Sequence, residues 1–291
     1  MWPKSCDPRM LPEAAPPIDR RTQPPERDMR KTLINYACEN MGLVSTAAIA
    51  AMFGRLQCKA ILALVERNNF KGADMSRGLL IAAFDFSNAH ADEFHDWYDL
   101  EHIPERAAVP GFDRCERWIG DDAPKHAVAT YDLDSSDVLR SDAYRAIAYD
   151  NLTVWSKRVT AMCARVLRFE GSQLTSGDEI APPNAGGLLL NAMNIAPEAE
   201  DDFNAWYDEE HLPALAAVPG TLSARRYQAR DDSNASHRYV AVFHLESPQV
   251  ARSEAWKSAA DTPWSARVVP HFRDRIRVLT RRYTRNDTAT R

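Results

Sequence analysis

The chain has 291 residues, of which 45% are hydrophobic, so it is long enough for two ordinary domains with well-filled cores. Its formal net charge is -5, with acidic and basic residues interspersed. This pattern argues against nucleic acid as a partner, because a nucleic-acid-binding protein normally has a basic face. Five widely spaced cysteines without a CxxC pair indicate reduced thiols, a cytoplasmic protein and no metal site.

The first 74 residues are predicted to be an N-terminal extension. Residues 1–30 are rich in proline, and residues 33–66 have a loosely helical pattern of small and apolar side chains. Polar and charged residues interrupt the apolar stretch 45–65, so we do not expect it to cross a membrane. Met75 opens a segment that resembles a natural protein start, which suggests that residues 1–74 are an appended leader or a segment wrongly assigned to the protein.

The rest of the chain is predicted to contain two tandem copies of one α+β unit. A shift of 109 residues places 78–118 on 187–227, with about 18 of 41 positions identical. The similarity resumes more weakly after a three-residue insertion in the second copy. Duplication explains this pattern. We therefore predict a first copy at 75–172, a linker rich in Ser, Gly and Pro at 173–186, a second copy at 187–285 and a tail at 286–291.

The predicted order of elements in each copy is strand, helix, strand, strand, helix, strand. The first copy should have strands at 78–86, 114–119, 126–133 and 165–169, and helical regions at 89–103 and from 136 to about 162. Pro104 limits the first helix, and Val-Pro-Gly at 109–111 makes a turn. Such a unit leaves one apolar sheet face uncovered. The second copy can cover it, which predicts an α+β fold of tandem ferredoxin-like repeats in a pseudo-dimeric barrel.

The peptide WYDxEHxP occupies the same place in both copies, at 97–104 and 206–213. Helical spacing puts Phe94, Tyr98 and His102 on one ridge. The partial negative charge of a helix C-terminus favours the histidine and disfavours the acids. A carboxylate beside a histidine can orient its ring and raise its pKa, which suits proton transfer. Alternatively, the aromatic residues belong to the core and the acids cap loop amides or pair with arginine.

The motif provides most of the candidate site residues. The candidate catalytic residues are His102, Glu101, His211, Glu210, Asp208 and Tyr207. The candidate substrate-binding residues are Arg117, Arg226, Tyr98, Trp206 and His237. The two arginines precede an aromatic residue in the second strand of each copy. Their guanidinium groups can hold a substrate carboxylate or form a structural ion pair with a motif acid.

Histidines outside the motif are weaker candidates. His126 and His237 begin the third strand of their copies, where a solvent-exposed histidine is the ordinary interpretation. His271 has no counterpart in the first copy and is the only isolated candidate for a haem axial ligand. The sequence contains no GxGxxG, Walker, HExxH or GxSxG motif, which disfavours nucleotide and nicotinamide chemistry.

With WYDxEHxP, a Val-Pro-Gly turn and an Arg-aromatic strand in both copies, roughly 200 residues resemble the EthD-like branch of the dimeric α+β barrel superfamily. The resemblance implies a barrel with a pocket between sheet and helices, and a small-molecule enzyme of catabolic or secondary metabolism. Relatives include muconolactone isomerase-like enzymes, cofactor-free monooxygenases, polyketide cyclases and decarboxylases, and haem-containing branches. The fold alone does not select among them.

The favoured expectation is cofactor-independent acid-base chemistry on an aromatic-derived or ring-opened organic acid, by an isomerase, lyase or decarboxylase. His211 would move the proton, Glu210 or Asp208 would orient it, Tyr207 would donate to an enolate-like oxygen and Arg226 would hold a carboxylate. The second copy is only marginally preferred. The alternatives are a haem- or oxygen-dependent oxidoreductase of the same barrel and a non-catalytic small-molecule-binding barrel. A homodimer is left open, because the fused units need no second chain to complete the barrel.

Overall fold

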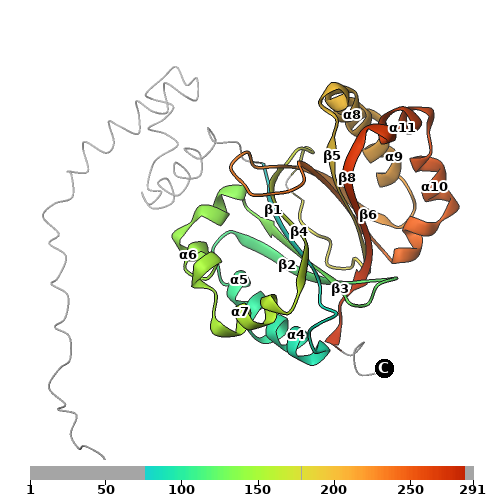
Figure 1. Ribbon diagram of the computed structural model, residues 1–291. Coiled ribbons are helices and arrows are strands. Elements are labelled where there is room, and N and C mark those ends of the chain that lie inside the picture. Colours follow the sequence, from blue (N-terminus) through green and yellow to red (C-terminus); the bar gives the residue numbers. More distant parts are fainter. Residues whose placement is uncertain (1–75, 178, 286–291) are drawn as a thin grey trace, which may run out of the picture. The chain divides into compact units, whose positions relative to one another are not determined.

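The computed structural model describes residues 76–177 and 179–285, so the predictions for residues 1–75 and for the tail 286–291 lie outside it. Within the described residues, eight strands close into one barrel in the order β1-β3-β2-β8-β5-β7-β6-β4, and all neighbours are antiparallel (Figure 1). The strands are β1 (Gly78–Asp85), β2 (Phe112–Gly120), β3 (His126–Leu133), β4 (Ala164–Gln173), β5 (Gly187–Ile195), β6 (Thr221–Ala229), β7 (Tyr239–Leu245) and β8 (Phe272–Arg282). The predicted α+β class and the barrel are confirmed.

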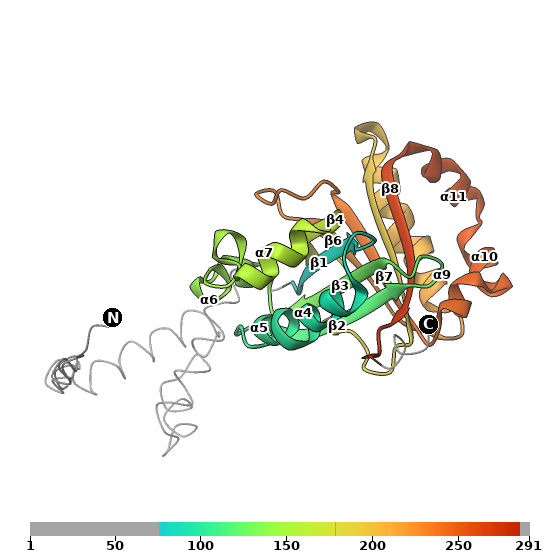
Figure 2. The same ribbon diagram turned by 60° about the horizontal axis from the view of Figure 1, so that its bottom comes forward.

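Two groups of helices flank the barrel on opposite sides (Figures 1 and 2). The first half, residues 76–173, contains α4 (Ala91–Trp97), η3 (Tyr98–His102), α5 (Ile103–Ala107), η4 (Ser136–Arg140), α6 (Asp142–Arg145), η5 (Tyr149–Asn151) and α7 (Val154–Ala161). The second half, residues 187–285, contains η6 (Pro197–Ala199), α8 (Glu200–Trp206), η7 (Tyr207–His211), α9 (Leu212–Ala216), η8 (Pro248–Arg252), α10 (Glu254–Ala260), α11 (Pro263–Val268) and η9 (Val269–His271). None of these described helices is long and apolar enough to span a membrane.

The two halves join at two short seams. Strand β2 pairs with β8 from Trp118 opposite Arg282 to Gly120 opposite Thr280. On the other side, β4 pairs with β6 along residues 171–173. An open sheet edge would present unpaired backbone donors and acceptors, and closure of the barrel removes both edges of each half. The interior and the outer faces of one continuous sheet are therefore the two surfaces on which a site can form.

Strand alternation divides the apolar residues into three layers. Residues such as Leu79, Ile81 and Leu188 point into the barrel, whereas the motif aromatics pack between the outer sheet faces and the helices. Trp97 and Trp206 are each 1% exposed. Full burial of such a ring contributes about 2 kcal/mol or more to the free energy of unfolding. The WYDxEHxP aromatics are thus part of the cores that attach the helices to the barrel.

The motif helix continues past Pro104, in contrast to the predicted end near residue 103. It passes from α4 through a wider π-helical turn, η3, into α5, which ends at Ala107. Proline is tolerated here because it directly follows the π-helical turn, where the regular α-helical hydrogen-bond pattern is already interrupted. The same α–π–α arrangement recurs in the second half.

The helical region predicted from residue 136 to about 162 is divided into four short segments. Three of these segments have a polar N-cap residue. Ser135, Ser141 and Thr153 each accept a hydrogen bond from a backbone N–H in the following turn. The predicted Val-Pro-Gly turns are present, with Gly111 and Gly220 at φ 90° and 89°. Only glycine adopts this left-handed conformation without strain.

Candidate active site

The glutamate of each motif fastens the motif helix to the start of a later helix. Glu101 Oε1 accepts hydrogen bonds from Thr153 Oγ1 at 2.6 Å and from Ser156 Oγ at 3.0 Å. Thr153 is also the N-cap of α7. In the second half, Glu210 Oε1 accepts from Thr262 Oγ1 at 2.5 Å, and Thr262 caps α11. A negative charge is favoured at a helix N-terminus, so these contacts explain the presence of the motif glutamates by a structural role.

Replacing Thr262 with valine is expected to lower the free energy of unfolding by about 1–2 kcal/mol, because the change removes a helix cap and a donor to Glu210. Thr153→Val should have a similar effect. Urea denaturation followed by circular dichroism measures both. The control is Thr160→Val, whose hydroxyl bonds only to backbone carbonyls of its own helix. Stability equal to the wild type in Thr262→Val would mean that the contact is not stabilising.

The aspartate of each motif pairs with the arginine that precedes the aromatic residue in the next strand. Arg117 Nη1 donates to Asp99, and Arg226 Nη1 lies 3.3 Å from Asp208 Oδ1. Both guanidinium groups are buried, and they lie 4.5 and 4.6 Å from the rings of Tyr98 and Tyr207. The structure therefore shows the ion pair with a motif acid that was one of the two interpretations of these arginines.

The second nitrogen of each arginine is also engaged. Arg117 Nη2 lies 2.8 Å from His95 Nδ1, and Arg226 Nη2 donates to Asn204 Oδ1 at the equivalent position. Burial, followed by the charge of Arg117, lowers the pKa of His95 to about 4. His95 is a buried histidine that sequence reasoning missed, because Asn204 replaces it in the second copy and the repeat therefore did not single it out.

The motif histidines lie in the two helix–sheet cores. The ring of His102 is 4.5 Å from that of Trp97, and the ring of His211 stacks on Trp206 at 4.0 Å. Both Nδ1 atoms are buried without a hydrogen-bond partner. Burial lowers the pKa of His211 to about 4, with a smaller contribution from Arg275, and lowers the pKa of His102 well below its ordinary value. The predicted rise in histidine pKa is wrong, because the glutamates bind threonines instead.

The other predicted residues lie in separate places. His237 is buried, with Nε2 2.6 Å from Asp274 O and Nδ1 2.8 Å from Ser236 Oγ. His126 is half-buried at the start of β3, and His271 is exposed in η9. Tyr98, Tyr207 and Trp206 are fully buried. The two copies therefore do not converge on one pocket built from these side chains, and their roles in binding or catalysis stay predictions.

A polar groove lies where the first-half helices meet the loop between β6 and β7. Three adjoining cavities of about 360, 400 and 280 Å³ form it, and Asp232 lines all three. Tyr149 and Glu170 line two of them, as does Arg230. Neither motif histidine is among the lining residues. The three-residue insertion of the second copy falls in the loop that borders the groove, and this insertion is the sequence signal for the groove.

Arg168 on β4 lines the 360 Å³ cavity. Its Nη2 donates to Glu170 and lies 3.3 Å from Tyr144 OH. Burial opposes the charge of Arg168, but Tyr144 and Glu170 outweigh burial and raise its pKa, so the cation is permanent. The ring of Tyr149, 53% exposed, lies 5.7 Å from this guanidinium. Tyr149 has φ 56°, a strained value for a bulky residue and a feature typical of functional sites.

Most polar side chains behind Arg168 are specific to the first half, whereas Tyr98 has the counterpart Tyr207. Tyr98 OH and Tyr131 OH are buried without a partner, and burial raises the pKa of both phenols. Strand register and the repeat alignment identify the second-half counterparts. Glu170, Tyr144, Arg106 and Tyr131 correspond to Leu279, Trp256, Leu215 and Phe243. The polar helix–sheet site thus lies in the first half, whereas the sequence marginally favoured the second.

No protein-family model and no curated protein matches this sequence. Solved structures match its fold. One provisionally assigned as a chlorite dismutase has a TM-score of 0.50 and 13% identity, and covers 74% of this chain and 98% of its own. An anthrone oxidase-like protein has a TM-score of 0.48 and 13% identity, and the match covers 73% of this chain and 93% of that protein. A protein from Lactobacillus acidophilus that is provisionally assigned as a monooxygenase has a TM-score of 0.48 and 10% identity, with coverages of 72% and 95%. At 13% identity the similarity to the structure with a TM-score of 0.50 shows the fold alone, which is that of the dimeric α+β barrel proteins.

The predicted isomerase, lyase or decarboxylase chemistry is contradicted. The solved structure that matches this barrel with a TM-score of 0.50 is provisionally assigned as a chlorite dismutase, which is the name of an oxidoreductase. The geometry agrees with the correction, since the histidine that was expected to move a proton is held neutral in a packed core. The alternative of an oxidoreductase in the same barrel agrees with the name given to that structure, whereas the favoured expectation does not.

Proposed function

We propose that this protein is an oxygen-dependent oxidoreductase that acts on a small phenolic or enolic organic anion bound in the groove above β4. The observation that carries the proposal is the permanent cation Arg168 in a 360 Å³ cavity beside the exposed ring of Tyr149. A fixed guanidinium stabilises an oxyanion, and an aromatic wall favours a planar substrate. The phenolate or enolate form of a substrate is its electron-rich form and reacts most readily with O2.

The reaction class is a two-electron oxidation. The substrate is a dihydroxylated aromatic ring or an enediol, and one hydroxyl loses its proton to solvent as the anion binds to Arg168. The anion then gives two electrons and its second hydroxyl proton to O2, and the hydroperoxide anion that forms takes one proton back from solvent. The products are a quinone or a diketone and hydrogen peroxide, so that atoms and electrons balance. The role of this chain is to bind and orient the anion and to lower the pKa of the substrate hydroxyl electrostatically.

Haem does not fit the described residues. A haem requires an axial side chain at the wall of a flat apolar cavity. The rings of His102 and His211 pack against tryptophan, and His271 lies on the surface outside the three cavities. The groove is lined mainly by polar and charged residues. Of the haem-dependent and oxygen-dependent oxidoreductases, we therefore propose an oxygen-dependent enzyme without haem.

The test is oxygen consumption and peroxide formation by the purified protein with planar hydroxylated acids such as gentisate and protocatechuate. Arg168→Gln is expected to lower kcat/KM by about 100-fold, because one charge-assisted contact to the oxyanion is lost. Arg168→Lys, which keeps the charge and loses the planar fork, should be intermediate. The matched control is Arg277→Gln, since Arg277 occupies the equivalent position on β8 and should leave turnover within about twofold.

Two results would contradict the proposal. Equal losses in Arg168→Gln and Arg277→Gln would place the site elsewhere on the protein. Ligand binding that depends on Arg168 without any oxygen consumption would favour the non-catalytic binding barrel instead. An anaerobic reaction mixture separates enzymatic oxidation from other substrate loss.

We also propose that the two halves are tandem ferredoxin-like copies of an EthD-like unit. Two observations support this: the aligned repeat in the sequence, and the same strand order in each half, β4-β1-β3-β2 and β8-β5-β7-β6. The repeated clasps between Glu101 and Thr153 and between Glu210 and Thr262 support it as well. The homodimer stays a prediction.

A further inference from the structure

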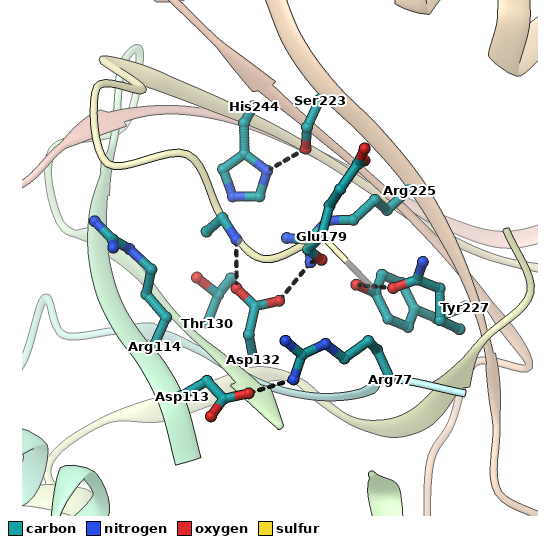
Figure 3. A network of polar contacts seen from close by, with 12 residues as sticks. Arg77, Asp113, Arg114, Thr130, Asp132, Glu179, Ser223, Arg225, Tyr227 and His244 are labelled. Carbon is teal, nitrogen blue, oxygen red and sulfur yellow. Dashed lines mark hydrogen bonds and ion pairs between the residues drawn. The ribbon is translucent and has the colours of Figure 1, made fainter. Parts of the chain in front are cut away.

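The barrel interior contains a buried polar cluster at the end where β1 and β5 begin, separate from the groove. It is shown in Figure 3, beneath the chain that links the two halves. Arg225 Nη1 donates to Asp132 Oδ1 at 2.6 Å, and both side chains are at least 96% buried. The ion pair crosses the barrel from β6 to β3. The backbone N–H of Ala181, in the linking chain, donates to the other oxygen of Asp132 at 2.8 Å.

The carboxylates of Asp132 and Glu116 have both oxygens occupied. Asp132 has the two contacts above. Glu116 Oε1 accepts from Arg114 Nε at 2.7 Å, and Oε2 accepts from Arg282 Nη1. A third carboxylate, that of Glu179, belongs to the same cluster and acts electrostatically on Arg225. The guanidinium groups of Arg114, Arg225 and Arg282 therefore face three carboxylates.

Three nitrogen atoms in the same cluster lack an acceptor within the described part of the chain. Arg225 Nε and Nη2 and His244 Nε2 are buried without a hydrogen-bond partner. Arg225 and His244 are 2% and 1% exposed, and Figure 3 shows the Arg225 guanidinium between His244 and Asp132. His244 Nδ1 lies 3.2 Å from Ser223 Oγ, so a serine that donates here leaves Nε2–H as a free donor. Each buried donor without an acceptor costs about 1–3 kcal/mol.

The repeat shows that the fold does not require this arrangement. Glu116 and Arg225 occupy equivalent positions of the two copies, as do Asp132 and His244. The first copy thus supplies acids where the second supplies a guanidinium and an imidazole. An ordinary barrel interior needs neither, because the rest of this interior is filled with apolar side chains.

We propose that this end of the barrel binds one small monovalent oxyanion, such as a carboxylate of one or two carbons or an inorganic oxyanion. Its oxygens accept from Arg225 Nε and Nη2 and from His244 Nε2, so that all three buried nitrogens gain an acceptor. A planar anion matches the fork of Nε and Nη2 in the bidentate manner typical of arginine. The apolar packing that surrounds the cluster restricts the ligand to a few heavy atoms.

Isothermal titration calorimetry with sodium formate and sodium nitrate, at constant ionic strength set by sodium chloride, tests the proposal on the full chain. We expect saturable binding of one anion per chain and a thermal midpoint that rises to a plateau. His244→Gln and Arg225→Lys should each weaken binding by about tenfold or more, because each removes a donor while Arg225→Lys keeps a cation beside Asp132. Arg168→Gln, in the groove, should bind with unchanged affinity.

The outcomes that overturn the proposal are clear. Binding that is absent, or that is unchanged in both His244→Gln and Arg225→Lys, would exclude the site. A crystal structure of the formate complex with only an ordered water at these nitrogens would also overturn it. Binding that is lost in Arg168→Gln instead would assign the anion to the groove. Preference for formate over nitrate, or the reverse, distinguishes a carboxylate source from an inorganic one.

Discussion

Replacing Asp132 with alanine is expected to destabilise the protein by about 3–5 kcal/mol, because it leaves Arg225 as a buried guanidinium without a carboxylate partner. Urea denaturation at pH 7 measures the change. Glu254→Ala is the control, since it breaks an exposed ion pair with Lys257 and should cost less than about 1 kcal/mol. The effect is large because both partners are removed from water and neither can regain solvent when the other is absent.

The double variant Asp132→Leu with Arg225→Met separates the value of the pair from the cost of breaking it. Because replacement of both charges by apolar side chains removes the desolvation penalty, the double variant should be more stable than Asp132→Ala. A double variant that is less stable than the single one would show that the ion pair itself holds the two halves together.

Lowering the pH from about 6.5 towards 4 is expected to destabilise the protein through His211. Its pKa is lowered from 6.5 to about 4 by burial, so in this window the unfolded chain takes up a proton and the folded chain does not. The folded state therefore loses up to about 3 kcal/mol as the pH falls, whereas this histidine has no effect above pH 6.5. Denaturation curves at several pH values in this range measure the loss.

His211→Gln should show a shallower pH dependence than the wild type, because the titrating ring is removed. The exposed His90 provides the matched control, and His90→Gln should follow the wild-type curve. The readout is the slope of stability against pH, so a constant loss of stability in His211→Gln does not obscure it. An unchanged slope in His211→Gln would show that the ring gains solvent or a partner in solution.

The predictions that succeeded depend on local patterns. The first-half strands lie within a few residues of their expected limits, because the period of apolar residues reflects strand and helix geometry directly. The turns at Gly111 and Gly220 follow from the conformations that proline and glycine adopt. The prediction that failed at Pro104 was also local, since the π-helical turn before it is a detail that apolar spacing does not encode.

The candidate site was less accessible from the sequence. The motif histidines stood out because they recur in both copies, yet the structure places them in packed cores. Arg168 and Tyr149 did not stand out, because their significance comes from an asymmetry between the copies. Leu279 at the position equivalent to Glu170 and the insertion beside Asp232 are visible in the alignment, but only the groove gives them a meaning.

By itself, the sequence showed a repeat at a shift of 109 residues, with the same motif and Val-Pro-Gly turn in each copy, and it predicted an α+β unit that occurs twice. The tertiary structure decided what the side chains do. It brings Glu101 to Thr153 across 52 positions and Asp132 to Arg225 across 93. Local conformational preferences act over a few residues, whereas these contacts depend on strand order, register and barrel closure. The repeated WYDxEHxP thus marks the duplication, while the polar groove and the charged barrel end arise only where the two copies meet.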